Sequence, residues 1–222
     1  KQYRCPGESY TISDSVCRGR QRVNYPKCNV CLEKVEPGGF AQSHAEPKLS
    51  INIFKSYDIR GKYPSELNDT TAHKIGTSIA LFFREKNPDV KNIVVGRDMR
   101  LSSKSLANAL IEGLCTAGLN VINVGVVSSE MTYFAVGHYK YDGGVMVTAS
   151  HNPAEYNGFK LCREQAIPVS FETGIDRISK LTKQYHPLRG EHLGKVIVSD
   201  IFADYKKHVL KFASNLRHLR VV

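Results

Sequence analysis

Tryptophan is absent from the sequence, and so is any hydrophobic run that approaches the roughly 20 residues of a membrane span. The N-terminus shows no signal-peptide pattern either. We therefore expect no membrane partner and predict a cytoplasmic location. The net charge is +10, but the positive excess is spread along the chain, without a basic stripe interleaved with aromatic residues. This distribution argues against nucleic acid as a partner and fits an enzyme that acts on small anions.

Large aliphatic residues are scarce in residues 1–48, which therefore need a cross-link or a metal in order to fold. Four cysteines lie in this segment: Cys5, Cys17, Cys28 and Cys31. The Cys28-x-x-Cys31 spacing is typical of half a zinc site, which Cys5 and Cys17 would complete. Reduced free thiols and disulfides are the alternatives. We interpret residues 1–48 as a Cys-rich extension and linker that is a candidate for structural Zn²⁺.

From residue 49 on, strand-like segments alternate with amphipathic helices. The predicted strands are residues 50–57, 92–96, 120–127, 143–149 and 157–162, and the predicted helices are 68–87, 103–118, 129–139, 172–184 and 198–213. This alternation requires crossover connections, and hence a sheet covered on both faces. We predict an α/β domain at residues 49–185, with three α/β/α layers and a mainly parallel, mixed sheet of about four strands. Residues 186–222 are interpreted as a linker and the truncated start of a second domain.

N-cap residues can be predicted for two of the helices. Asp69 or Thr70 is predicted to cap the helix at 68–87, and Ser103 the helix at 103–118. Cys115 and Cys162 stand alone inside hydrophobic patterns, so we expect both to be small core residues.

Polar residues follow four of the predicted strands, at residues 57–61, 96–98, 128–130 and 148–153. Ligands of α/β sheets bind where the strands deliver their carboxyl ends. Each motif alone is equally typical of a turn or an isolated ion pair. Together they bring two arginines, a histidine and a serine hydroxyl to one rim, which suits an anionic substrate.

The stretches FKSYDIRG (54–61), VVGRDMR (94–100) and TASHNPAEYNGFK (148–160) together resemble the first domain of the α-D-phosphohexomutases, the phosphomannomutase/phosphoglucomutase family. The resemblance covers residues 50–185 and continues into the start of that family's second domain. The Ser-Ser-Glu at 128–130 departs from the Thr-Pro expected after the third strand.

The resemblance implies that Ser150 is the phosphorylated serine of an enzyme that interconverts hexose 1-phosphate and hexose 6-phosphate. Ser150 would donate its phosphoryl group to a hexose phosphate, giving a hexose 1,6-bisphosphate intermediate. His151 and Lys160 match residues beside the transferring group, as proton shuttles and charge stabilisers. Arg60 matches an active-site arginine, and Tyr57 a residue next to it.

The same resemblance implies that Arg97 and Asp98 support the serine loop. We expect Asn152 to brace that loop by hydrogen bonds to its backbone. Gly158 is expected to let the chain turn, so that Lys160 returns to the rim and brings a cation to the phosphate.

The resemblance also implies a Mg²⁺ ion that bridges the phosphorylated Ser150 and an Asp-rich loop of the second domain. No Asp-Gly-Asp-Gly-Asp-Arg motif occurs in this sequence. We therefore interpret the chain as a fragment whose partners are a hexose phosphate and domains 2–4 of the same enzyme, and expect it to be nearly inactive alone. The alternative hypothesis is a zinc-dependent module that binds nucleic acid or protein, attached to a catalytically retired α/β domain.

Overall fold

The computed structural model describes residues 2–3, 12–13, 51–187 and 193–213. The chain divides into two compact units, Lys1–Glu46 and Pro47–Val222. In the first unit, strand β1 (Gln2–Tyr3) pairs with β2 (Ile12–Ser13) in an antiparallel ladder. The predicted zinc ligands Cys5, Cys17, Cys28 and Cys31 lie outside the described residues.

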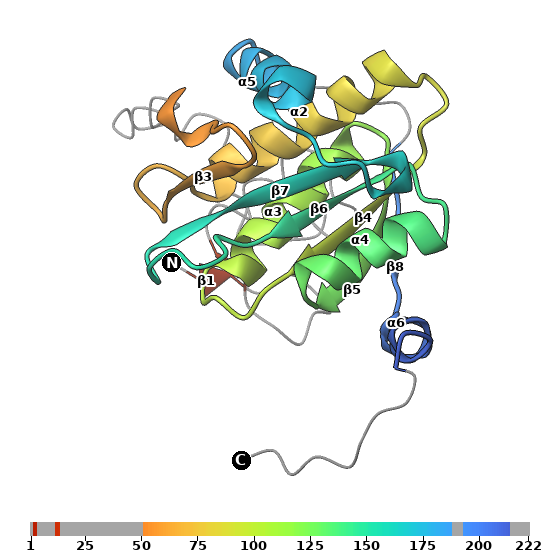
Figure 1. The fold of residues 1–222 in the computed structure, drawn as a ribbon. Coiled ribbons are helices and arrows are strands. Elements are labelled where there is room, and N and C mark those ends of the chain that lie inside the picture. The colour runs from red at the N-terminus through yellow and green to blue at the C-terminus, as the bar shows by residue number, and fades with distance from the viewer. Residues whose placement is uncertain (1, 4–11, 14–50, 188–192, 214–222) are drawn as a thin grey trace, which may run out of the picture. The chain divides into compact units, whose positions relative to one another are not determined.

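The second unit is an α/β domain in which helices alternate with strands (Figure 1). Its strands are β3 (Ile59–Lys62), β4 (Asn92–Arg97), β5 (Asn120–Val126), β6 (Gly143–Val147), β7 (Tyr156–Arg163) and β8 (Val196–Val198). Its α-helices are α2 (Asp69–Lys86), α3 (Ser103–Thr116), α4 (Ser129–His138), α5 (Asp176–Lys183) and α6 (Phe202–Leu210). Short helical turns occupy Ile51–Ile53, Glu164–Ala166 and Phe171–Ile175.

The sheet is mixed and has six strands in the order β3-β7-β6-β4-β5-β8. Strands β6, β4, β5 and β8 run parallel, whereas β7 is antiparallel to both of its neighbours. The predicted mixed α/β class is confirmed, but the prediction of about four strands is wrong. The three-residue strand β8 was missed because it is too short to show an alternating pattern. The apolar run at 50–57 is largely a helical turn and bend, and the strand follows it at Ile59.

Successive residues of the central strand β4 point to opposite faces of the sheet. Ile93 and Val95 belong to the larger core, which is shared with α2 and α3, whereas Val94 belongs to a smaller core with residues of α4. Both faces of β4 are therefore buried, as its continuous hydrophobic sequence predicts. Helices α2, α3 and α5 cover one face of the sheet, and α4 covers the other (Figure 1).

Both predicted helix caps are corrected to the residue just before the predicted candidates. Asn68 caps α2, because its side chain accepts a hydrogen bond from the Thr71 N–H at 3.0 Å. The N-cap position of α3 is Ser102, without a side-chain capping bond. Ser103 does not cap because its hydroxyl donates to the Asp98 carboxylate instead, at 2.5 Å. Ser103 is the first residue of α3, and its hydroxyl binds the loop that contains Asp98.

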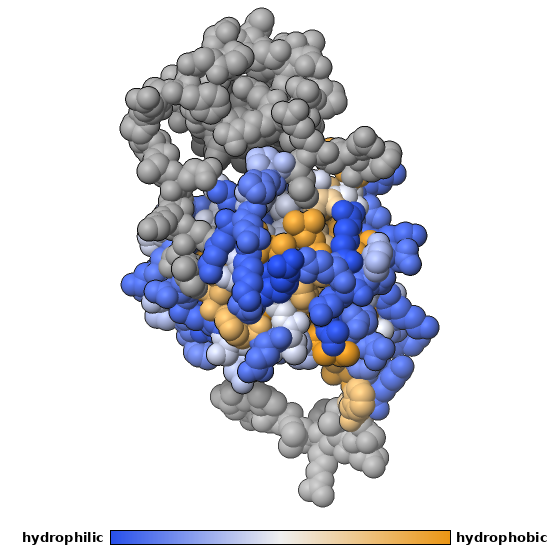
Figure 2. All heavy atoms as spheres, turned by 90° about the horizontal axis from the view of Figure 1, so that it is seen from above, coloured by the Kyte–Doolittle hydropathy of each residue, from blue (hydrophilic) through white to orange (hydrophobic). Residues whose placement is uncertain are grey.

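The two isolated cysteines lie in or against the core, as predicted. Cys162 is fully buried and Cys115 is partly buried. Burial raises the pKa of the Cys162 thiol to about 12 and that of Cys115 to about 11. Since the thiolate is the reactive form, both side chains are poor nucleophiles. The surface in Figure 2 is mainly hydrophilic with smaller apolar areas. None of the described helices combines the length and the hydrophobicity that crossing a bilayer requires.

Helix α6 docks on α4 through an aromatic cluster and one hydrogen bond. Phe134 contacts His208 and Tyr205 of α6, with ring centroids 5.0 and 5.4 Å apart. The Tyr139 hydroxyl donates to the Asp204 carboxylate at 2.5 Å. That hydrogen bond, with partial burial and the charge of Asp204, raises the pKa of Tyr139 to about 12.

We expect alkaline pH to weaken this contact. Because the folded-state pKa of Tyr139 is raised above 10.0, its contribution to stability is complete below about pH 10 and is lost as the pH approaches about 12. Ionised tyrosine would face the Asp204 carboxylate with a like charge. NMR of ¹³C-labelled tyrosine should show one ring titrating near pH 12, accompanied by shifts of α6 signals. If Tyr139→Phe keeps the same alkaline transition in α6, the assignment to this pair is wrong.

Candidate active site

The serine loop, residues 148–153, follows strand β6 at the carboxyl edge of the parallel strands. Ser150 is exposed, and its backbone φ of 55° lies in the left-handed region, which a non-glycine residue seldom adopts. The Ser150 N–H donates to the Thr148 hydroxyl oxygen at 3.0 Å. Unusual backbone angles in well-braced loops cluster at functional sites. The serine hydroxyl is therefore exposed to solvent on a loop whose backbone is fixed by a hydrogen bond inside the loop.

Asp98 anchors this loop by hydrogen bonds. One carboxylate oxygen accepts the Thr148 hydroxyl at 2.7 Å. The other accepts the Ser103 hydroxyl and the Arg100 backbone N–H, at 2.5 and 3.0 Å. Because Thr148 in turn accepts the Ser150 N–H, the carboxylate fixes the serine backbone through one intermediate hydroxyl.

Arg100 holds the loop from the other side, and sequence reasoning did not single it out. Its guanidinium donates to the backbone carbonyls of Ser150 at 2.9 Å, Asn152 at 2.7 Å and Pro153 at 2.7 Å. A longer bond reaches the Tyr156 carbonyl at 3.2 Å. The side chain is only 16% exposed and also pairs with Asp98 at 3.3 Å. The rigid fork of an arginine suits such a multiple contact. The only indication of this role in the sequence is that Arg100 is the last residue of the VVGRDMR stretch.

Arg60 reaches the serine loop through Asn152. Its guanidinium donates to the Asn152 side-chain oxygen at 2.9 Å and pairs with the buried Asp58 carboxylate. Asn152 was expected to brace the backbone of its own loop. Its side chain instead ties the loop to strand β3, and Arg100 makes the backbone contacts. An arginine is thus fixed beside the loop that bears Ser150.

Lys160 lies on strand β7, on the face of the sheet that α4 covers. It is paired in register with Met146 of β6. The Met146 sulfur accepts the hydroxyl of Thr132, a residue of α4, at 3.4 Å. Because cross-strand partners share a face, Lys160 points toward the α4 side.

Arg60 shares that face. It pairs in register with Gly158, two residues before Lys160. The neighbouring pair, Ile59 and Phe159, lies in the core on the opposite face, under α2 and α3. Side chains alternate along a strand, so Arg60 and Lys160 lie on the same side of the sheet.

Gly158 does not form the turn that was expected of it, because it lies within the continuous strand β7. A Cβ atom at this position would come within 2.1 Å of the Ile59 carbonyl oxygen. The glycine therefore permits close approach of β3 to β7. That approach brings Arg60 beside the strand that carries Lys160.

The remaining predicted residues lie around the rim. His151 is exposed, with its Nδ1 3.5 Å from the Ser150 hydroxyl oxygen, at the outer limit of a hydrogen bond. Tyr57 is 79% exposed. The Arg97 guanidinium donates to the Asp98 carbonyl at 3.3 Å, so it contacts the Asp98 turn rather than the serine loop. The catalytic role of His151 and the binding or supporting roles of Tyr57 and Arg97 stay predictions.

Helix α4 brings a carboxylate to the same side of the sheet as Lys160. Ser128 caps the helix by accepting the Met131 N–H at 3.3 Å. The pKa of Glu130, in the first turn, is lowered by a hydrogen bond from its own backbone N–H, by one from the Ser128 hydroxyl and by the charge of Lys160, against partial burial. The charge of Lys160 is the smallest of these causes.

Tyr133, one turn along α4, lies among the same charged residues. Burial is the main reason that its pKa is raised, and the charges of Cys162, Glu130 and Asp58 raise it further.

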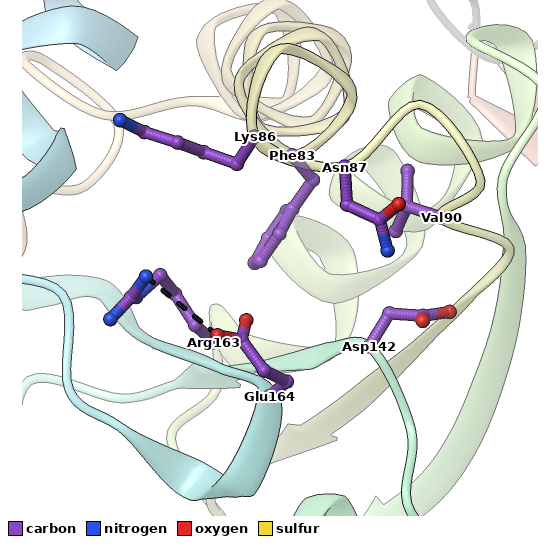
Figure 3. Close-up of a pocket in the computed structure, with 7 residues that line it drawn as sticks. All are labelled: Phe83, Lys86, Asn87, Val90, Asp142, Arg163 and Glu164. Atoms are coloured by element: carbon purple, nitrogen blue, oxygen red, sulfur yellow. Dashed lines mark ion pairs between the residues drawn. The ribbon is translucent and has the colours of Figure 1, made fainter.

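A hollow of about 300 Å³ lies at the other end of the sheet (Figure 3). Phe83 points into it, and Asp142 and Arg163 lie at its edge, close to the amino end of β6. None of the predicted site residues lines it. This hollow is therefore separate from the serine loop.

The described part of the chain contains no group of three or more His, Cys, Asp and Glu side chains that could hold a metal ion. The Asp98 carboxylate, which lies nearest to the serine loop in the hydrogen-bond network, is already engaged by Thr148, Ser103 and Arg100. These residues do not fit a complete magnesium site.

The family model described as Phosphoglucomutase/phosphomannomutase, alpha/beta/alpha domain I matches residues 52–188. Among curated proteins, a phosphomannomutase of Vibrio cholerae is 41% identical over 162 residues, which are 73% of this chain and 35% of the relative. A phosphomannomutase of Klebsiella pneumoniae is 41% identical over 157 residues, which are 70% of this chain and 97% of that protein. The chain spans about a third of the length of the first of these relatives.

Two solved structures share the fold. A phosphoglucomutase/phosphomannomutase family protein from Burkholderia thailandensis has a TM-score of 0.65 and 29% identity, over 78% of this chain and 37% of that one. A putative phosphomannomutase from Thermus thermophilus has a TM-score of 0.63 and 28% identity, over 72% and 35% of the two chains. The family match, the identities and the fold agree with the motifs around Ser150, and the chain belongs to the phosphoglucomutase/phosphomannomutase family.

Proposed function

We propose that Ser150 carries the phosphoryl group of a phosphohexomutase that interconverts hexose 1-phosphate and hexose 6-phosphate, of the mannose or glucose type. The observation that supports this most strongly is the presentation of Ser150. Its hydroxyl is exposed on a loop that Arg100 and Asp98 hold in place, beside an arginine fixed by Asp58 and Asn152. Relatives that match this chain are named phosphomannomutases.

We propose that the phosphoryl group is transferred in two steps. A hydroxyl oxygen of the hexose phosphate attacks the phosphorus of phosphoserine, and the bond between phosphorus and the Ser150 oxygen breaks. The sugar hydroxyl loses its proton, and the serine oxygen gains one. The product is a hexose 1,6-bisphosphate and free Ser150. The reverse transfer, from the other phosphate of the bisphosphate, restores phosphoserine and completes the isomerisation.

The protein contributes mainly positioning and charge to such a step. The left-handed backbone at Ser150 and the contacts from Arg100 restrict where the oxygen lies. Arg60 and Lys160, on one face of the sheet, supply positive charge for the phosphoryl oxygens. His151 is the proposed proton carrier because it lies next to the serine and is exposed to solvent.

The described residues do not form a magnesium site. We therefore propose magnesium binding only for a protein that also includes the second domain. Full turnover, the choice of hexose and the contribution of domains 2–4 are proposed for a protein that includes the parts of the relatives that this chain does not match. For the chain alone we propose partial chemistry, namely phosphate exchange at Ser150.

The proposal is tested by mapping phosphate after incubation with hexose 1,6-bisphosphate. Intact-mass and peptide analysis should place one phosphate on Ser150, and Ser150→Ala should abolish it because the acceptor oxygen is lost. Ser56→Ala, at an exposed serine upstream of β3, serves as the matched control and should leave labelling unchanged. Phosphate mapped reproducibly to another residue, with normal turnover of the Ser150→Ala enzyme, would refute the assignment.

A further inference from the structure

Asn157 of strand β7 is a polar residue that is completely buried. Burying an amide is costly unless its hydrogen bonds are made. The side-chain oxygen accepts the Gly158 N–H at 2.8 Å, which determines which end of the amide is oxygen. The side-chain NH₂ group donates to the hydroxyl oxygens of Ser102 and Ser103, at 2.8 and 2.9 Å. A group that can only donate therefore faces the two serines at the start of α3.

The Ser103 hydroxyl links this amide to Asp98. A serine hydroxyl has one proton to donate and lone pairs that accept. The Ser103 oxygen accepts from Asn157, and its proton points to the Asp98 carboxylate, which accepts it at 2.5 Å. Because the amide can only donate, it cannot compete for that proton. Asn157 thus holds the Ser103 hydroxyl in the orientation in which it donates to Asp98.

Two further hydrogen bonds lead from Asp98 to Ser150. The other oxygen of the Asp98 carboxylate accepts the Thr148 hydroxyl at 2.7 Å. Since the Thr148 proton is used in that bond, the Thr148 oxygen is left to accept the Ser150 N–H, at 3.0 Å. A continuous series of hydrogen bonds therefore runs from the buried amide of Asn157 to the left-handed backbone of Ser150.

We propose that Asn157 is a positioning residue: through the Ser103 hydroxyl and the carboxylate that it binds, Asn157 keeps Ser150 in the conformation that exposes its hydroxyl. This inference rests on the proposed function of Ser150 and extends it to a residue inside the core. Asn157 has no exposed surface, so it is out of reach of a hexose phosphate. Its effect passes through Ser103 and must disappear when the Ser103 hydroxyl is removed.

A double-mutant cycle on the full chain tests this dependence, with hexose 1,6-bisphosphate as the phosphate donor. We expect Asn157→Ala to lower the maximal rate of Ser150 labelling about 10-fold, because an indirect contact should misplace the oxygen less than the 1 Å that costs about 100-fold. The donor concentration at half the maximal rate should not change. Ser103→Ala should cause a similar loss, and combining the two should cause no further loss. Losses that multiply, or a parental rate in Asn157→Ala, would contradict the inference.

Asn157→Asp separates the direction of the hydrogen bond from the volume of the side chain. It keeps the shape, so no cavity forms, but it places an acceptor oxygen where the NH₂ group donates. The Ser103 proton is then drawn toward residue 157 and away from Asp98. We expect a loss of labelling rate at least as large as in Asn157→Ala, and this variant decides the question if the alanine protein does not fold. A parental rate would show that the direction of the bond has no effect.

Ser102→Ala is the matched control. The Ser102 hydroxyl accepts from the same amide, but within the described residues no hydrogen bond joins its side chain to Asp98 or to the serine loop. Removing it should therefore leave the labelling rate close to that of the parent. A loss as large as in Ser103→Ala would mean that the start of α3, rather than the Asp98 contact, controls the loop, and the inference would fail.

NMR of the Ser150 backbone amide tests the series of hydrogen bonds without reference to activity. Its proton signal should move upfield and exchange faster with solvent in Asn157→Ala and in Ser103→Ala, because the bond to Thr148 weakens, but not in Ser102→Ala. An unchanged amide in Asn157→Ala contradicts the inference. Absence of phosphate on Ser150 in the parent chain would instead contradict the proposed function, and the amide signal would still decide whether Asn157 positions the loop.

Discussion

Replacing Arg100 with alanine should reduce phosphate transfer at Ser150 about 100-fold, the cost of a small misplacement of a reacting group. The guanidinium donates to four backbone carbonyls, at Ser150, Asn152, Pro153 and Tyr156. Without it, those carbonyls lose the one side chain that links them, and the loop is free to leave the left-handed conformation at Ser150. The rate of labelling by hexose 1,6-bisphosphate measures the loss.

Lysine at position 100 should rescue little of this activity. It keeps the positive charge near Asp98 but lacks the planar fork that reaches several carbonyls at once. Arg84→Ala provides the control, because Arg84 is an exposed residue of α2. Hydrogen exchange separates a local from a global effect. Amides of residues 149–156 should exchange faster in Arg100→Ala, whereas those of α2 should not change. Labelling at the parental rate would show that the loop does not need this contact.

Much of the fold could be predicted because its main strands are short hydrophobic runs separated by amphipathic helices. β4, β5, β6 and β7 were all expected within a few residues of where they lie. The sequence could not show that β7 runs antiparallel, since strand direction depends on the connections rather than on composition. It also misplaced β3, because the apolar run at 51–54 supplies buried residues such as Ile53 without being a strand.

The candidate site, like the fold, could be predicted only in part. Ser150 and Asp98 could be singled out as candidates because each belongs to a motif that lies within one short segment of the chain. The roles of Arg100 and Asn152 could not, because each depends on a partner more than 50 residues away in the sequence: Arg100 contacts the Asn152 carbonyl and Asn152 accepts from Arg60. Such contacts are set by the sheet order, which the sequence pattern leaves open.

The close contact between α2 and α3 predicts the second large effect, which is a loss of stability when a glycine in this contact is replaced. Gly76 of α2 lies directly against α3, and a Cβ atom there would come within 2.3 Å of the Leu110 carbonyl oxygen. Gly113 of α3 is in the reciprocal position, where a Cβ atom would come within 2.2 Å of the His73 carbonyl oxygen. In both cases the obstacle is backbone, which cannot rotate away. The two helices can accept a methyl group only by moving apart.

We therefore expect Gly76→Ala to lower the free energy of unfolding by about 3 kcal/mol, as for overpacking of a rigid core. Gly137→Ala is the matched control. Gly137 also lies in a helix, α4, but nothing lies within 4 Å of a Cβ atom built there. Alanine has the higher helix propensity, so Gly137→Ala should raise the free energy of unfolding by about 0.5 kcal/mol.

Urea denaturation of the full chain, followed by circular dichroism, measures both changes. The two substitutions add the same methyl group and gain the same helix propensity, so the difference between them isolates the clash with Leu110. Opposite signs are the expected result. A Gly76→Ala protein as stable as the parent would mean that α2 and α3 lie farther apart than the structure places them. The shared core between these helices and the sheet would then need a different packing.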